Sequence, residues 1–233
     1  MNADLIGRRW TFSPAARVVR SLLQRLILFP LLALVTPVTV RDRARLRSLC
    51  GPVIVAANHV SHLDTPVILK ALPAAVRRRL IVVAAKDYFY RGRIRGALVS
   101  LSLATIPFDR DQGSAESLAQ CQDLLERGWS LLVFPEGTRS ASGELGRVRR
   151  GVAVMATATG TPVLPLYVHG LAEIMPKGSI APLPGGVVVE AGNLLLPGAD
   201  IETTRNRLED SLHDLASRAP EWGRAGRNSR DRS

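Results

Sequence analysis

Short apolar runs recur along the chain, and stretches with helical spacing separate them. Six runs have the length and composition of buried strands: 52–57, 80–85, 104–108, 130–134, 162–168 and 187–191. Helices are predicted between and after them, over 66–72, from near Gly92 to 102, from an N-cap at Ser114 to just before Gly128, and over 152–159 and 201–215. Strands that are apolar throughout and alternate with helices are typical of a sheet covered on both faces. We therefore predict an α/β fold with a mostly parallel or mixed central sheet flanked by helices.

The N-terminal region has a different pattern. Residues 26–40 read LILFPLLALVTPVTV, and as a helix they would cover about 22 Å, short of the roughly 30 Å hydrocarbon core of a bilayer. Pro30 and Pro37 interrupt the run. We interpret it as an amphipathic, membrane-associating helical segment that lies in the interface or re-enters it. A buried N-terminal helix packed on the domain is the alternative.

The distribution of charge along the chain supports contact with a membrane surface. The formal net charge is +11, and arginines flank the apolar run on both sides at positions 8, 9, 17, 20, 25, 41, 43, 45 and 47. Basic residues beside apolar sequence suit anionic lipid headgroups. Nucleic-acid binding would instead call for basic residues interleaved with aromatics, which make up only 5% of the chain, so we expect no nucleic-acid partner. We expect the protein to be membrane-associated, on the cytoplasmic face of the cell membrane.

Length and composition suggest three regions. Residues 1–48 would form the N-terminal membrane-associating segment, 49–217 one catalytic domain, and 218–233 a disordered basic tail. The two cysteines, Cys50 and Cys121, are far apart and have no metal-ligand spacing, which fits a reducing compartment.

The first candidate site follows the 52–57 run. Residues 58–64 read NHVSHLD, which places His59 and Asp64 just past a strand end. A neutral imidazole can remove a proton from a hydroxyl, and a carboxylate behind the ring can hold its tautomer. Asp64 could instead be a simple acid in the first turn of the next helix. His59 and His62 offer too few ligands for zinc, so we expect no metal site.

The second candidate site is the FPEGTRS sequence at 134–140, which follows another predicted strand. Gly137 would allow a sharp turn, Thr138 could donate to an anion, and the planar fork of Arg139 suits phosphate. Glu136 could accept from substrate hydroxyls or pair with an arginine. A solvated surface turn is the alternative interpretation. Arg110 follows the 104–108 run and is expected at the same edge of the sheet as the two motifs.

Four motifs in order resemble those of the lysophospholipid and glycerolphosphate acyltransferases. NHVSHLD at 58–64 resembles the first motif of this family, IPFDR ending at Arg110 the second, FPEGTRS the third, and TPVLPL at 161–166 the fourth. The second motif lacks an upstream glycine, and arginines stand at 149 and 150 where lysines are common. Both departures bear on which acceptor headgroup the site would bind.

The resemblance implies a role for each site residue. His59 would be the catalytic base and Asp64 its orienting partner. The acceptor would be bound by Arg110, Glu136, Gly137, Thr138 and Arg139. Acyl-CoA or acyl-carrier protein would donate the acyl group, with no metal and no further cofactor.

We therefore expect an acyltransferase of phospholipid biosynthesis that acts on a lysophospholipid, with 1-acylglycerol-3-phosphate as the first choice of acceptor. Related enzymes that use glycerol-3-phosphate or a lyso-aminolipid, a hydrolase that uses the same pair to activate water, and an inactive lipid-binding homologue are the alternatives.

Overall fold

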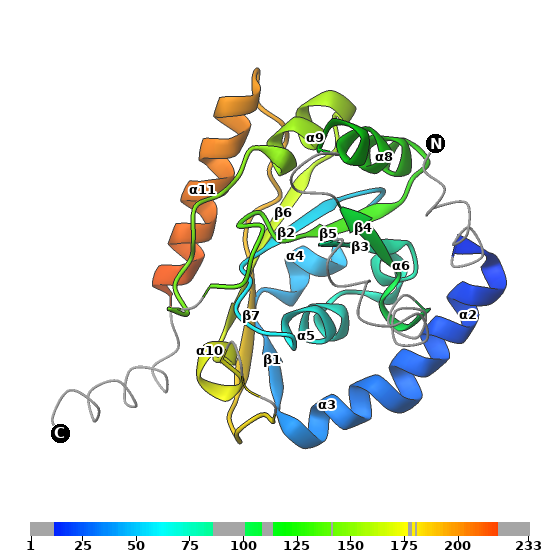
Figure 1. Cartoon of the computed structure of the whole chain (residues 1–233), viewed down its shortest axis with the longest axis vertical. Coiled ribbons are helices and arrows are strands. Elements are labelled where there is room, and N and C mark those ends of the chain that lie inside the picture. Colours follow the sequence, from blue (N-terminus) through cyan, green and yellow to red (C-terminus); the bar gives the residue numbers. More distant parts are fainter. Residues whose placement is uncertain are drawn as a thin grey trace, which may run out of the picture.

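The computed structural model describes residues 12–85, 101–108, 114–140, 142–176, 179 and 181–218. Within these residues seven strands form one sheet in the order β1-β7-β6-β2-β5-β3-β4 (Figure 1). The strands are β1 (Val38–Val40), β2 (Ile54–Ala57), β3 (Leu80–Ala85), β4 (Thr105–Phe108), β5 (Ser130–Val133), β6 (Val163–His169) and β7 (Val187–Ala191). Strands β6, β2, β5, β3 and β4 run parallel, β7 is antiparallel to β6, and β1 is parallel to β7. The predicted mixed α/β sheet is confirmed.

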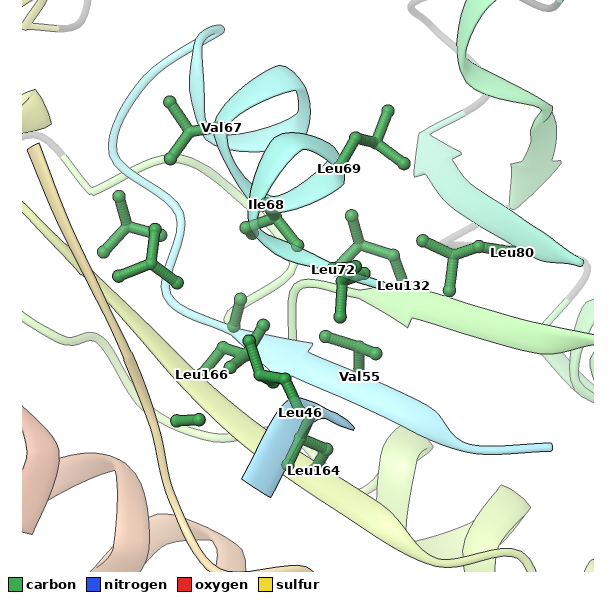
Figure 2. Close-up of a cluster of buried hydrophobic side chains, with 14 of the residues drawn as sticks. Leu46, Val55, Val67, Ile68, Leu69, Leu72, Leu80, Leu132, Leu164 and Leu166 are labelled. Carbon is green, nitrogen blue, oxygen red and sulfur yellow. The ribbon is translucent and has the colours of Figure 1, made fainter. Parts of the chain in front are cut away.

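Helices cover both faces of this sheet. They are α2 (Pro14–Leu23), the π-helical η2 (Gln24–Leu28), α3 (Phe29–Val35), α4 (Arg43–Arg47), α5 (Asp64–Ala71), α6 (Ala74–Arg77), α8 (Ser114–Glu126), α9 (Gly151–Thr159), α10 (Leu171–Ile174) and α11 (Ile201–Ser217). Side chains of α8, α9 and α11 build the core on one face. Those of α3, α4, α5, α6 and α10 build the core on the other, part of which Figure 2 shows. Strand β2 alternates between the two cores, with Ile54 and Ala56 in one and Val55 and Ala57 in the other.

The topology places β2 in the middle of the parallel part of the sheet, with β5 directly beside it. Ala56 of β2 is in register with Val133 of β5, so both strands end at the same edge. The chain leaves β2 into residues 58–64 and leaves β5 into residues 134–140. The expected meeting of the two sequence motifs at one edge of the sheet is therefore confirmed.

The N-terminal helix is longer than the sequence predicted. Elements α2, η2 and α3 join into one helix of 22 residues, Pro14–Val35, which at 1.5 Å per residue is about 33 Å long. It is long and apolar enough to cross a bilayer. The π-helical turn lies just before Pro30, and the Phe29 N–H bonds to the Gln24 carbonyl five residues back. Such a widened turn accommodates a proline that cannot donate within the helix.

This helix turns polar side chains toward the domain and most of its apolar side chains toward the outside. Arg20 and Gln24 are buried against the domain, where they donate to the carbonyls of Leu101 and Ser102 at 2.7 and 2.8 Å. Leu32 packs into the core, but most of the apolar side chains of the helix face outward. The most exposed are Val18, Val19, Leu22, Leu26, Ile27, Leu31 and Leu34. A helix with a buried polar face and an exposed apolar one is suited to lipid on its outer side, which indicates membrane association.

The end of the apolar run does not lie in this helix. The helix ends at Val35, and Val38–Val40 form β1, which pairs with β7 at one edge of the sheet. The interpretation of all of 26–40 as one interfacial segment is wrong for these residues. The α4 residue Leu46 is also part of the core, at 2% exposure. Residues 36–48, which the sequence placed in the N-terminal segment, thus contribute to the folded domain.

Candidate active site

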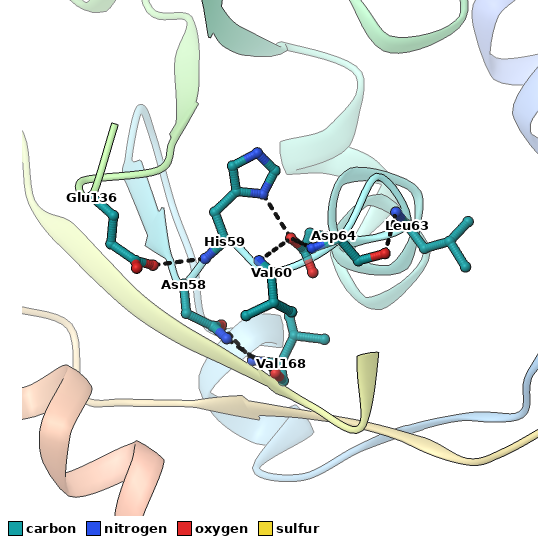
Figure 3. Close-up of polar contacts among 8 residues, drawn as sticks. Asn58, His59, Val60, Leu63, Asp64, Glu136 and Val168 are labelled. Carbon is teal, nitrogen blue, oxygen red and sulfur yellow. Dashed lines mark hydrogen bonds and ion pairs between the residues drawn. The ribbon is translucent and has the colours of Figure 1, made fainter. Parts of the chain in front are cut away.

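His59 and Asp64 form a close pair at the end of β2 (Figure 3). The His59 Nδ1 lies 2.7 Å from the Asp64 Oδ2. The same carboxylate oxygen accepts the backbone N–H groups of Val60 and Ser61, each at 2.8 Å. The chain turns tightly after His59, and Asp64 opens α5, so two residues five positions apart can meet. The predicted pairing is confirmed by this geometry.

The arrangement selects one tautomer of the imidazole. Asp64 is completely buried, and an ionised carboxylate can only accept hydrogen bonds, so Nδ1 of His59 carries the proton. The other ring nitrogen, Nε2, is then an acceptor. The His59 side chain remains 21% exposed, so a reactant can reach the ring. A neutral imidazole with an open Nε2 and a carboxylate behind Nδ1 is a general-base arrangement.

The loop after β5 holds His59 by its backbone. Glu136 is buried, and its Oε1 accepts the His59 N–H at 2.8 Å, as Figure 3 shows. The Ser140 N–H donates to the His59 carbonyl at 2.7 Å. The ring of Phe134 stacks on the imidazole with centroids 4.0 Å apart and an interplanar angle of 17°. The second motif therefore fixes both the peptide groups and the ring of the first.

Glu136 joins two loops. Its second oxygen, Oε2, accepts the Gly146 N–H at 2.8 Å, so each carboxylate oxygen has a backbone partner. Burial raises the pKa of the Glu136 carboxyl, while the hydrogen bonds from His59 and Gly146 act in the opposite direction. The contacts make Glu136 a positioning residue for the catalytic loop. Direct binding of the acceptor by this residue stays a prediction.

Gly137 provides space for Arg149. Its φ is +75°, and a Cβ added there would lie 3.1 Å from the Arg149 Nε. The Arg149 N–H also donates to the Pro135 carbonyl at 3.0 Å. The guanidinium group thus packs directly on the turn of the second motif. A residue other than glycine would be strained here and would displace the arginine.

A basic groove of about 820 Å³ opens beside this turn. It is lined by Glu136, Thr138, Arg139, Ser140, Gly146, Arg147, Val148, Arg149, Arg150, Glu202 and Arg205. Five arginines against two glutamates, one of them buried, give the groove a positive charge. Of the five predicted binding residues, Glu136, Thr138 and Arg139 lie in its wall. A fourth, Gly137, makes room for the Arg149 side chain that lines it. The groove is therefore a candidate site for an anionic group, and two residues of its wall, Glu136 and Ser140, bond to the backbone of His59.

Several residues of the groove were not predicted as site residues. Arg149 and Arg150 belong to a visible arginine cluster, but their spacing from the FPEGTRS motif does not show that they fold back on it. Glu202 comes from the start of α11, where it pairs with Arg150 and with Arg205 at 3.3 Å. Nothing in the sequence around Glu202 points to a groove. Phe134 precedes the loop at the strand end, and that position is the one signal for its stacking role.

The remaining predicted residues are placed as follows. Arg110 lies outside the described residues. His62 is near Arg139, and burial followed by the charges of Arg139 and His59 lowers its pKa. In the described part of the chain, no group of three or more His, Cys, Asp or Glu side chains is arranged to hold a metal ion.

Comparisons with known proteins agree with the fold and show the family. The family model described as "Acyltransferase" matches residues 37–169. A chloroplastic 1-acyl-sn-glycerol-3-phosphate acyltransferase of Brassica napus is 28% identical over 166 residues, which cover 70% of this chain and 47% of that protein. A 1-acyl-sn-glycerol-3-phosphate acyltransferase of Pseudomonas aeruginosa is 34% identical over 123 residues, or 52% of this chain and 45% of that protein. The chain spans about half the length of these two relatives.

A solved structure shares the fold. The crystal structure of the 1-acyl-sn-glycerophosphate acyltransferase from Thermotoga maritima superimposes with a TM-score of 0.66 at 23% identity, covering 93% of this chain and 83% of that one. The family match contains β1, the His59–Asp64 pair, the 134–140 loop and β6. On these grounds the chain belongs to the acyltransferase family.

Proposed function

We propose that this protein transfers a fatty acyl group from a thioester donor to the free hydroxyl of 1-acylglycerol-3-phosphate, which gives phosphatidic acid. The observation that carries the proposal is the position of His59. Its ring is oriented by Asp64 at 2.7 Å, and its backbone is bonded to the loop that forms one wall of the basic groove. A base for a hydroxyl and a site for a phosphate are the two elements that this acceptor requires.

The proposed mechanism depends on the tautomer of His59, in which Nδ1 carries the proton and Nε2 is free to accept one. The Nε2 of His59 removes the proton from the acceptor hydroxyl as its oxygen attacks the thioester carbonyl. Asp64 stabilises the imidazolium that forms. The tetrahedral intermediate collapses, the carbon–sulfur bond breaks, and the imidazolium returns the proton to the departing thiolate. The products are an ester and a free thiol, and no covalent acyl-enzyme is needed.

The acceptor phosphate would be bound in the groove. Arg139 and Arg149 present planar guanidinium groups, which bind phosphate oxygens in pairs. Thr138 lies at the rim and offers a hydroxyl. The names of the Brassica napus and Pseudomonas aeruginosa relatives, which both specify 1-acyl-sn-glycerol-3-phosphate, support this acceptor over other lysolipids.

We propose acyl-CoA or acyl-carrier protein as the donor, with no cofactor beyond it. Both donors are thioesters of the cytoplasm, and we place the enzyme on the cytoplasmic face of the membrane for that reason. The outward apolar face of the Pro14–Val35 helix supports the membrane part of this proposal. A membrane location also brings the enzyme to an acceptor that is itself a lipid.

The test is product analysis with the purified full chain. Labelled acyl-CoA is incubated with 1-acylglycerol-3-phosphate, glycerol-3-phosphate and a lyso-aminolipid in turn. We expect phosphatidic acid as the main product, and its loss in the His59→Ala variant. The exposed helix residue His213 provides the control, since His213→Ala should retain activity. Labelled free fatty acid as the main product would indicate a hydrolase, and a preferred product from another acceptor would contradict the headgroup assignment.

The anion site is tested by a second pair of variants. Arg139→Ala and Arg149→Ala should each raise the KM for the phosphorylated acceptor by about ten-fold or more, because a charge-assisted hydrogen bond contributes roughly 1.5–3 kcal/mol. The exposed pair residue Arg127, on a distant surface, serves as control through Arg127→Ala. An unchanged acceptor KM in both groove variants would show that the turn is only structural.

A further inference from the structure

The loop before β7 exposes apolar residues on a rigid frame. Leu183 is 60% exposed, and Ala181 and Pro184 beside it are also exposed. No residue from Ala181 to Val189 carries a charge. Single exposed leucines are ordinary on protein surfaces, so exposure alone decides nothing. The position of this loop, residues 181–186, is the more informative observation.

Four contacts fix the 181–186 loop. The Leu183 N–H donates to the Ile174 carbonyl at 2.8 Å, and the Thr36 hydroxyl donates to the Gly185 carbonyl at 2.6 Å. The Val187 N–H donates to the Pro37 carbonyl at 3.0 Å. Gly185 is packed so closely that a Cβ would lie 2.8 Å from the Ile174 Cγ1. The loop is therefore held with Leu183 facing outward.

The loop is bonded to the end of the N-terminal helix. Thr36 follows α3 directly, and Leu34 in its last turn is 85% exposed. Leu34 and Leu183 each stand two residues from the bonded pair Thr36–Gly185, so their Cα atoms are at most about 20 Å apart. In Figure 1 this loop lies beside the end of α3, between α10 and the start of β7. The exposed end of the helix and the exposed loop therefore lie in the same part of the molecule.

We propose that the 181–186 loop is a second membrane contact, in which Leu183 inserts into the same leaflet as the outward face of the Pro14–Val35 helix. The inference rests on the membrane association in the proposed function. One helix lying on a bilayer holds the domain along a single line, and only the width of its apolar face limits rotation about the helix axis. A second contact at the end of that helix sets the tilt of the domain and therefore the height of the catalytic edge above the lipid.

The chain offers a matched control at the other end of β7. Leu196 is 67% exposed, close to the value of Leu183, and lies in the segment that follows this strand. Its neighbour Leu195 pairs with Val163 at the start of β6, whereas the 181–186 loop bonds to the end of α3. The two leucines thus share exposure and differ in position.

The experiment uses an environment-sensitive fluorophore on single cysteines. In the full chain with Cys50→Ser, the remaining Cys121 is buried and its pKa is raised to about 12, so it does not compete for the label. The variants Leu183→Cys, Leu196→Cys and Leu26→Cys are labelled and mixed with vesicles of equal parts phosphatidylcholine and phosphatidylglycerol. Quenching by brominated lipid reports insertion of each site.

We expect positions 26 and 183 to be quenched and position 196 to stay in water. Quenching at 26 without quenching at 183 would overturn the loop contact and leave the proposed function standing. Equal behaviour of 183 and 196, whether both are quenched or neither is, would also overturn it. Absence of quenching at all three positions would contradict both the loop contact and the membrane part of the proposed function.

A charge substitution gives an independent measure. Leu183→Glu should weaken partitioning of the full chain to these vesicles roughly ten-fold, because an inserted leucine would be replaced by a carboxylate. Leu196→Glu should change partitioning less than two-fold. Thermal unfolding of both variants is measured alongside, since both positions are exposed and neither change should affect stability. Equal partitioning of the two variants would count against the loop contact.

Discussion

Glu136 accepts the backbone N–H of His59 at 2.8 Å, while Ser140 donates to the carbonyl of the same residue at 2.7 Å. The loop of the second motif thus binds both peptide groups of the proposed base. Asp64 fixes the ring at the other end. The position of His59 depends on these backbone contacts as well as on its partner carboxylate, and they explain why an acid is buried in the loop.

Replacing Glu136 by glutamine should separate this positioning role from charge. In Glu136→Gln an amide NH₂ stands opposite either the His59 or the Gly146 N–H, so one backbone donor loses its partner. We expect a loss of about 1–3 kcal/mol in stability. We also expect kcat to fall roughly 10–100-fold because the base is displaced. Steady-state kinetics and thermal unfolding measure both, and exposed Glu144→Gln in the same segment is the control. Full activity in Glu136→Gln would refute the positioning role.

Asp64→Asn tests the tautomer argument. The asparagine oxygen can still accept from the Val60 and Ser61 amides, so the loop should keep its shape. The negative charge that stabilises the imidazolium is lost, and kcat should fall about 10²–10⁴-fold with little change in either KM. Asp123→Asn removes an exposed carboxylate that pairs with Arg127 and should be neutral. A KM effect without a kcat effect would show that Asp64 only shapes the acceptor site.

Gly137→Ala and Gly160→Ala form a matched pair. Both glycines have positive φ, +75° and +64°, so each alanine should cost roughly 1–2 kcal/mol of backbone strain. A Cβ at 137 would also meet the Arg149 side chain, whereas nothing lies within 4 Å at 160. We expect both variants to lose stability and only Gly137→Ala to raise the acceptor KM. Equal KM values in the two variants would exclude a role for the Arg149 contact.

Much of the fold could be predicted from the local pattern of apolar and polar residues in the sequence. The predicted ranges 80–85 and 187–191 coincide with β3 and β7, because each is an apolar run flanked by polar or glycine residues. The meeting of residues 58–64 with residues 134–140 also followed, since parallel strands bring their carboxyl ends to one edge. These features depend on periodicity and on topology, which a sequence displays directly.

Other features depend on contacts between distant parts of the chain. Strand β1 is three residues long, and its partner β7 lies near the other end of the sequence, so Val38–Val40 read as the end of an apolar helix. The pairing of Arg150 with Glu202 likewise joins the loop before α9 to α11. The length of the N-terminal helix was underestimated because Arg20 and Gln24 interrupt the apolar pattern, although both residue types favour helix, and their partners lie about 80 residues away in the sequence.

The buried polar face and exposed apolar face of the N-terminal helix predict different effects for substitutions at two neighbouring positions, one on stability and the other on membrane binding. Gln24→Leu removes the donor to the part-buried Ser102 carbonyl and leaves that carbonyl unpaired, so stability should fall by about 1–3 kcal/mol. Leu26→Gln changes a side chain that is 70% exposed, so stability should stay within about 0.5 kcal/mol while vesicle binding weakens. Thermal unfolding in detergent and vesicle sedimentation measure the two effects. The reverse pattern would mean that the helix packs with its apolar face inward.

His169 should make stability depend on pH. It is buried at the end of β6 beside Tyr167, with ring centroids 4.6 Å apart. Burial, followed by the charge of Arg41, lowers its pKa to about 4 from the ordinary 6.5, while a hydrogen bond to the Leu215 backbone acts in the opposite direction. Between these two values the unfolded chain binds the proton and the folded protein does not. The stability contributed by neutral His169 is therefore complete above pH 6.5 and is lost as the pH falls toward 4, by up to about 3 kcal/mol.

The measurement is unfolding free energy at a series of pH values across this window. His169→Gln has no titrating ring, so its stability should fall less steeply than that of the wild type as the pH decreases. His213→Gln, on the exposed face of α11, should keep the wild-type slope. Because the site residues His59 and Asp64 are unchanged in both variants, acyl transfer at neutral pH provides the check on folding. Identical slopes in His169→Gln and the wild type would show that other groups govern the acid sensitivity of the fold.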